Sequence, residues 1–220
     1  MVRFTLVLLL AASVCAGTGT AAAQAPSDVK DGKVTVIGEN PGIRLTTKEG
    51  APPSTSVSFW RVLQSPAGEG HVCFVTSDIK GDGPTPDDIR LAFADNEKLA
   101  EYVAQQLMTA FDKAYGEKPF PVRRARFERS GDTATAWKET IKAEGYAIDL
   151  VWRDFYEPFA IESRAGVPHN PYTILSTFVP ARTAEVVVNG TRAAGSATPR
   201  MRGTRQSSSA FLAFAETWLK

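Results

Sequence analysis

The sequence predicts an α+β protein, mainly antiparallel β, in which a curled meander sheet or a barrel packs against one long amphipathic helix. Short runs rich in β-branched and aromatic residues recur along the chain, separated by turns that contain glycine. Only one segment, 96–115, keeps a helical period of apolar residues over its whole length. Because helices do not alternate with strands, a parallel α/β sheet is not expected.

The first half of the chain contains strand patterns bounded by turn residues. Asn40-Pro41-Gly42 separates the first two, and a turn cluster over 65–70 joins "SVSFWRVL" to "HVCFVTS", which predicts a hairpin. The stretch 89–95 alternates like a strand, but Thr85 and Pro86 before it suit the start of a helix, so either structure is possible there.

The segment 96–115 is predicted to be a helix. Asp95 can cap its start, and Gly116 with Pro119 can end it. Its apolar stripe has the 3–4-residue spacing that buries one helix face, and it consists of Leu99, Tyr102, Val103, Leu107, Ala110, Phe111 and Ala114. We expect this stripe to cover a face of the sheet.

The second half returns to strands, with a meander over 122–154. Asn189-Gly190 is the strongest hairpin signal in the chain. The following segment, 195–209, is predicted to be a long loop, and the end of the chain, 210–219, fits a short C-terminal helix slightly better than a strand.

The first residues predict export. Arg3 precedes an apolar run, and Ala23-Gln24-Ala25 has the small-x-small pattern that a signal peptidase accepts. We therefore expect a cleaved signal peptide over 1–25 and a single β-rich domain over 26–220, with no transmembrane segment in the mature chain. After cleavage only Cys73 remains, so no internal disulfide can form, and this favours the bacterial periplasm.

Composition and motifs exclude several functions. A net charge of +1 argues against a nucleic-acid partner, which requires a basic surface. The chain has no nucleophile elbow, no glycine-rich phosphate loop and no HExxH, and no motif identifies a cofactor or a metal.

The candidate ligand-binding residues are mostly arginines. Their guanidinium groups match carboxylates, phosphates and sulfates, and residues 186–215 contain arginines but no acid. Aromatic side chains can line an apolar cavity beside them. The candidates are Arg124, Arg126, Arg200, Arg202, Arg205 and Trp152.

His71 and Cys73 form a second candidate site. On a strand their side chains share one face, where they can make a reactive pair or, with His169, bind a metal. The alternative, favoured here, is that Cys73 packs as a small buried hydrophobe.

These observations favour a binding protein over an enzyme. The sequence predicts an exported, soluble protein that binds a small amphipathic or anionic ligand in a pocket between sheet and helix. One alternative is a hydrolase or isomerase that uses His71 and Cys73. The other is a module that binds another envelope protein.

Overall fold

The computed structural model describes residues 32–85, 88–166 and 170–220, and most of the secondary structure in these ranges is β-strand. The predicted signal peptide, 1–25, and His169 lie outside the described residues. The strands are β1 Val34–Glu39, β2 Gly42–Leu45, β3 Thr55–Gln64, β4 Gly70–Ser77, β5 Ile89–Ala94, β6 Val122–Gly131, β7 Ala136–Ala143, β8 Tyr146–Phe155, β9 Phe159–Ser163, β10 Thr173–Val188, β11 Thr191–Arg192, β12 Pro199–Arg202, β13 Arg205–Ser208 and β14 Ala210–Leu219.

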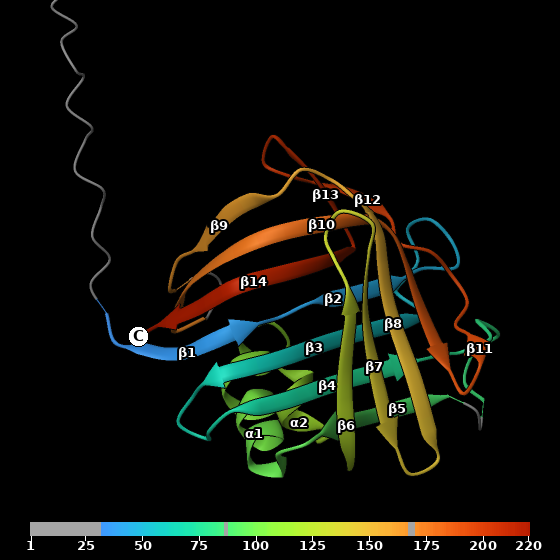
Figure 1. The fold of residues 1–220 in the computed structure, drawn as a ribbon, viewed down its shortest axis with the longest axis horizontal. Coiled ribbons are helices and arrows are strands. Elements are labelled where there is room, and N and C mark those ends of the chain that lie inside the picture. Colours follow the sequence, from blue (N-terminus) through green and yellow to red (C-terminus); the bar gives the residue numbers. More distant parts are fainter. Residues whose placement is uncertain (1–31, 86–87, 167–169) are drawn as a thin grey trace, which may run out of the picture. The chain divides into compact units, whose positions relative to one another are not determined.

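Nine strands close into a barrel, in the order β14-β2-β3-β4-β5-β6-β7-β8-β10, because β10 pairs with β14 (Figure 1). Neighbours in this ring are antiparallel except β5 and β6, which are parallel and are joined by the helical segment. A parallel pair needs such a crossover. Outside the ring, β1 pairs with β14 and β3, and β9 pairs with β10.

The end of the chain corrects the prediction of a C-terminal helix. Residues 210–219 form strand β14, which pairs with β10 along most of its length and also with β1 and β2. A left-handed Ala215 (φ 49°) lies where the β10 register shifts. Such an irregularity changes which face later side chains occupy, so the apolar residues lose strict alternation and imitate a helical period. The open stretch 89–95 is likewise a strand, β5.

The segment 195–209 is not only a loop. Its residues form the two-stranded hairpin β12–β13, in which Arg202 lies opposite Arg205 across the turn. We call this element the arginine hairpin. The Asn189-Gly190 turn between β10 and β11 is confirmed, and both residues have the positive φ, 50° and 81°, that a tight hairpin turn of this type requires.

The helix predicted over 96–115 is observed as one helical run over 97–110, made of three kinds of turn, and a separate short helix follows it; together they cover one side of the barrel (Figure 1). They are α1 Glu97–Tyr102, the π turn η1 Val103–Leu107, the 3₁₀ turn η2 Met108–Ala110 and α2 Ala114–Glu117. Asn96, rather than Asp95, caps α1, because its side chain accepts a hydrogen bond from the Leu99 amide. A π turn inserts an extra residue and rotates the stripe. Leu107 remains buried, whereas Phe111, predicted to be buried, is 55% exposed.

Two apolar clusters lie on the two sides of the sheet. The barrel interior contains Phe59, Cys73, Trp152 and Leu212, among other buried side chains. The outer cluster lies between the strands and the helical segment, and its large members include Trp60, Phe74, Trp218, Leu99 and Val103. Sheet and helix therefore share a buried face, as the sequence predicts.

Candidate functional site

A groove lies between the barrel wall, the helical segment and the arginine hairpin. Its volume is about 380 Å³, within the range of small-molecule sites, which is roughly 300–1,000 Å³. We call it the hairpin groove. Its lining comes from β2, β3, β10, β14, the helical segment and the hairpin, and it consists of Asn40, Gly42, Arg44, Val57, Ser58, Met108, Phe111, Phe178, Arg200, Met201, Arg202, Ser207, Ser208 and Phe211.

Two apolar side chains of this groove are unusually open to solvent. Met201 is 62% exposed and Phe111 is 55% exposed, more than the other large hydrophobic side chains that the structure exposes among its described residues. Phe178 and Phe211 stack behind them, with ring centroids 4.4 Å apart. Exposed apolar groups gathered in one concave place are typical of a binding surface.

The charged side chains of the groove all have the same sign. Arg44, Arg200 and Arg202 contribute guanidinium groups, and the lining contains no carboxylate. None of the three forms an ion pair with another described residue. Arg202 places its guanidinium carbon 5.5 Å from the centroid of the Phe178 ring. The groove therefore combines arginines that form no ion pair among the described residues with apolar surface.

A buried carboxyl group lies beside the groove. Asn40, which lines it, donates a hydrogen bond to Glu216 Oε1 at 3.4 Å, and the Trp218 indole donates to the same oxygen at 2.9 Å. Burial raises the pKa of Glu216 to about 7, although the hydrogen bonds and the charge of Arg202 work against this. The group therefore changes its charge near neutral pH.

The sequence-predicted ligand residues do not all meet at this groove. Arg200 and Arg202 line it, but Arg205 lines a separate recess of about 470 Å³ together with Arg182. Arg124 and Arg126 are exposed on β6, whose neighbour Ala125 faces the barrel interior. Trp152 is fully buried in the interior, where its indole donates to the Gly42 carbonyl at 3.1 Å.

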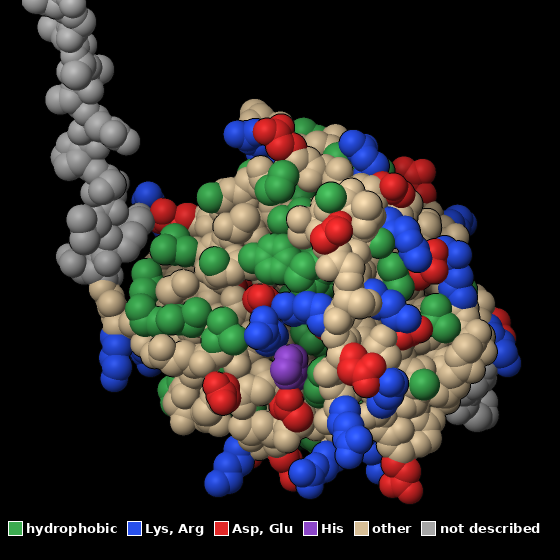
Figure 2. Space-filling view, in the orientation of Figure 1, with side chains coloured by type: hydrophobic (Ala, Val, Ile, Leu, Met, Phe, Trp, Pro, Cys, Tyr) green, Lys and Arg blue, Asp and Glu red, His purple; other side chains and the backbone are tan. Residues whose placement is uncertain are grey.

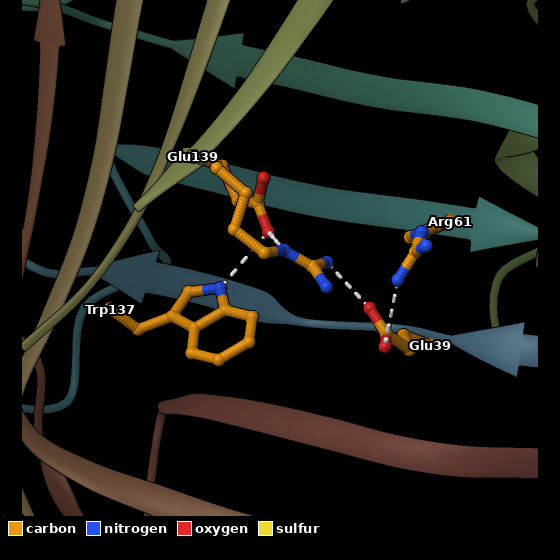
Figure 3. Close-up of polar contacts among 5 residues, drawn as sticks. Glu39, Arg61, Trp137 and Glu139 are labelled. Atoms are coloured by element: carbon orange, nitrogen blue, oxygen red, sulfur yellow. Dashed lines mark hydrogen bonds and ion pairs between the residues drawn. The ribbon is translucent and has the colours of Figure 1, made fainter. Parts of the chain in front are cut away.

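A second polar cluster lies inside the barrel. The Glu139 carboxylate, 2% exposed, accepts hydrogen bonds from Arg129 Nε at 2.6 Å and Trp137 Nε1 at 3.0 Å. Glu39 lies between two guanidinium groups, 2.5 Å from Arg129 and 3.5 Å from Arg61 (Figure 3). Burial raises the pKa of Glu139, and Arg129 opposes this. The ion pairs therefore run in a line from Arg61 through Glu39 and Arg129 to Glu139.

His71 and Cys73 share the inner face of β4, as the sequence predicts, but they have different surroundings. Cys73 is fully buried, and burial, together with the charge of Glu139, raises the pKa of its thiol well above the usual value. His71 is partly exposed, and its Nδ1 lies 2.7 Å from Asp95 Oδ2. His71 therefore has an acidic partner, whereas the cysteine resembles a core residue.

We expect Cys73 to resist alkylation. A thiol reacts as its thiolate, and this one is both shielded and held in the neutral form. Iodoacetamide at pH 7.5 should modify the native protein at least about 100-fold more slowly than the protein unfolded in urea, as measured by mass spectrometry. Equal alkylation rates in the native and the unfolded protein would instead show that Cys73 is a reactive group.

Sequence reasoning missed Arg44, Phe111, Met201 and Glu216. Arg44 and Met201 carry no local signal, because each is an ordinary residue of a short strand. Phe111 was assigned to the buried stripe. Glu216 could have been suspected, since it is an acid inside a strongly apolar run. Among the described residues, no cluster of three or more His, Cys, Asp or Glu could hold a metal ion.

None of the helices in the described ranges is long and apolar enough to span a membrane.

No protein-family model matches the sequence, and no curated protein matches it. Two solved structures show limited similarity to this chain. One is an acetoacetate decarboxylase from Legionella pneumophila, with 9% identity, a TM-score of 0.38, and coverage of 86% of this chain and 85% of the other. The second is also an acetoacetate decarboxylase, with 9% identity, a TM-score of 0.42, and coverage of 87% and 88%. Similarity of this size assigns neither family nor reaction to this chain.

Proposed function

We propose that the protein binds a small amphipathic anion in the hairpin groove. One observation carries this proposal: three arginines without a carboxylate meet the two most exposed large apolar side chains, among the described residues, in a single recess. The anionic end of the ligand would pair with Arg200 and Arg202, whose forks suit carboxylate, sulfate and phosphate groups. Its apolar end would cover Phe111 and Met201.

The proposal keeps the sequence-based expectation of an exported, soluble binding protein. Export is supported by the pattern of residues 1–25 alone. A pocket between sheet and helix is also what the sequence predicts, and the hairpin groove is bordered by both. The preferred ligand is a dissolved monomer, because a recess of about 380 Å³ fits one short chain.

Titration calorimetry with decyl sulfate, kept below its micelle concentration, tests this function. We expect the double substitution Arg200→Ala and Arg202→Ala to weaken binding by at least about tenfold, since a hydrogen bond to a charged group contributes roughly 1.5–3 kcal/mol. Decanol, which lacks the charge, should bind the wild-type protein more weakly than decyl sulfate.

The matched control removes the same charge elsewhere. Arg124→Ala with Arg126→Ala, on the outer side of β6, should change the decyl sulfate Kd by less than about twofold. An equal loss in both double variants would mean that net charge, and not the groove, attracts the ligand. Binding only to vesicles with anionic lipid, and not to the monomer, would also contradict the proposal.

A further inference from the structure

A separate cleft of about 430 Å³ opens on another part of the barrel, and His71 lies in it. Its lining includes Arg61, Leu63, Glu69, His71, Asp95 and Asn96. We call it the histidine cleft. None of these residues lines the hairpin groove. Figure 2 shows acidic and basic side chains around the exposed imidazole in the middle of one face.

The His71 ring is held in one orientation. Asp95 accepts a hydrogen bond from the His71 backbone amide at 2.7 Å through Oδ1, and contacts Nδ1 at 2.7 Å through Oδ2. The Phe127 ring stacks on the imidazole, with centroids 5.0 Å apart and planes at 17°. In the neutral imidazole, a carboxylate at Nδ1 favours the tautomer with the hydrogen on Nδ1, and that tautomer has its lone pair on Nε2.

The backbone around Asp95 supports this contact. Gly70 has φ +143°, and a Cβ there would lie 2.5 Å from Asp95 Oδ1, so only glycine lets the carboxylate approach. Asn96 caps α1 and also donates to the carbonyls of Ala67 and Glu69. The end of β5 and the start of the helix are therefore fixed beside His71.

An arginine, Arg61, lies opposite His71 on the neighbouring strand. Arg61 is the direct cross-strand partner of His71, so the two side chains leave the same face of the sheet. Its ion pair with Glu39 is long at 3.5 Å, and the Arg61 side chain is 40% exposed. Such a pair is weak, so Arg61 can bind an anion in the cleft. Glu69 and Asp95 are the acidic side chains that line the cleft, and Glu69 is exposed.

We infer that the histidine cleft is a catalytic site in which His71 acts as general base in the hydrolysis of a small ester that carries a carboxylate, with Arg61 binding that carboxylate. His71 Nε2 takes a proton from water as the water oxygen bonds to the acyl carbon. The bond from that carbon to the leaving oxygen breaks, the leaving group keeps the electron pair, and the imidazolium returns the proton to it or to solvent. Asp95 is a positioning residue.

Two aryl esters test this inference: neutral 4-nitrophenyl acetate and the anionic mono-4-nitrophenyl ester of glutarate. Their leaving group needs no acid, so nitrophenolate release reports the base alone. The full chain is used in a His169→Gln background, which leaves His71 as the only imidazole. We expect a preference of about tenfold for the anionic ester in kcat/KM.

Three variants assign the roles. His71→Gln should lower kcat by about 100-fold for both esters. Asp95→Asn should lower kcat at least about tenfold with KM unchanged, because Asp95 contacts the imidazole and not the ester. Arg61→Met should raise KM for the anionic ester alone and abolish the charge preference. Lys142→Gln, on the outer surface, should match the parent.

The results separate the parts of the inference. A His71→Gln rate within twofold of the parent, or a parent rate equal to that of buffer, would overturn the catalytic site. A rate that depends on His71 without a charge preference would overturn the assigned substrate class. Because the arginines of the hairpin groove are intact in all these variants, decyl sulfate binding should be unchanged, and this checks the fold as well.

Discussion

Replacement of Arg129 by methionine is expected to destabilise the protein by about 3 kcal/mol at pH 8, the largest effect that the structure predicts. The substitution removes the partner of two shielded carboxyl groups, Glu139 and Glu39, and leaves Glu139 without a cation in a site that is 2% exposed. Thermal unfolding should show a fall in Tm of about 6–12 °C for a chain of this size.

The cause can be separated from the loss of packing. If an unpaired charge is responsible, Glu139→Gln in the Arg129→Met background should recover at least about half of the lost stability. Arg124→Met, exposed on the same strand, should change Tm by less than about 2 °C. A double variant as unstable as Arg129→Met alone would show that the arginine acts through packing.

The penalty should also depend on pH. Burial raises the pKa of Glu139 even with Arg129 in place, and removal of the guanidinium raises it further. The cost is therefore complete where Glu139 is ionised and decreases as pH falls, because a protonated carboxyl needs no cation. Below the pKa of the unfolded carboxyl, about 4.5, wild type and variant should converge in stability apart from the packing loss.

Replacement of Glu216 by glutamine is expected to stabilise the protein, by an amount on the order of 3 kcal/mol at pH 8.5. The pKa of Glu216 is about 7 in the folded protein, against an ordinary value of 4.5. The folded state therefore binds this proton more tightly than the unfolded state does. Wild-type stability should fall as pH rises from about 4.5 to 7 and stay reduced above that range.

Glutamine keeps the shape of the side chain but cannot ionise. Its amide oxygen can accept the same hydrogen bonds from Trp218 and Asn40. The difference in free energy of unfolding between variant and wild type, measured in urea, should be large at pH 8.5 and close to zero at pH 4. Glu144→Gln, at an exposed turn, serves as the control. A stability difference that stays the same at both pH values would exclude titration of Glu216 as the cause.

Local sequence patterns predicted most of the strands, with β12, β13 and β14 as exceptions and β5 left open, and they predicted where the helix starts. The turn at Asn189-Gly190 and the shared face of His71 and Cys73 follow from rules that need only neighbouring residues. The basic character of segment 195–209 was also predictable, because the absence of acidic residues can be read directly from the sequence. The hairpin that this segment forms could not be predicted, because strands of four residues are too short to show a clear alternation of apolar and polar residues.

Sequence patterns could not predict contacts between residues that lie far apart along the chain. By its own pattern the run 210–219 fits a helix slightly better than a strand, and only pairing with β10 and β2 makes it a strand. Asp95 was expected to cap a helix, yet it holds His71, which is 24 residues away. Arg129 meets Glu39 across 90 residues of chain.

The sequence by itself therefore determined the β-rich class, most strand positions and the basic character of one segment. Only the tertiary structure decided that the strands close into a barrel, that the π turn exposes Phe111 and that Glu216 is buried. The physical reason is the distance along the chain over which each interaction acts. Backbone propensity and side-chain alternation act over a few residues, whereas burial, pKa and ion pairing depend on neighbours that folding brings together.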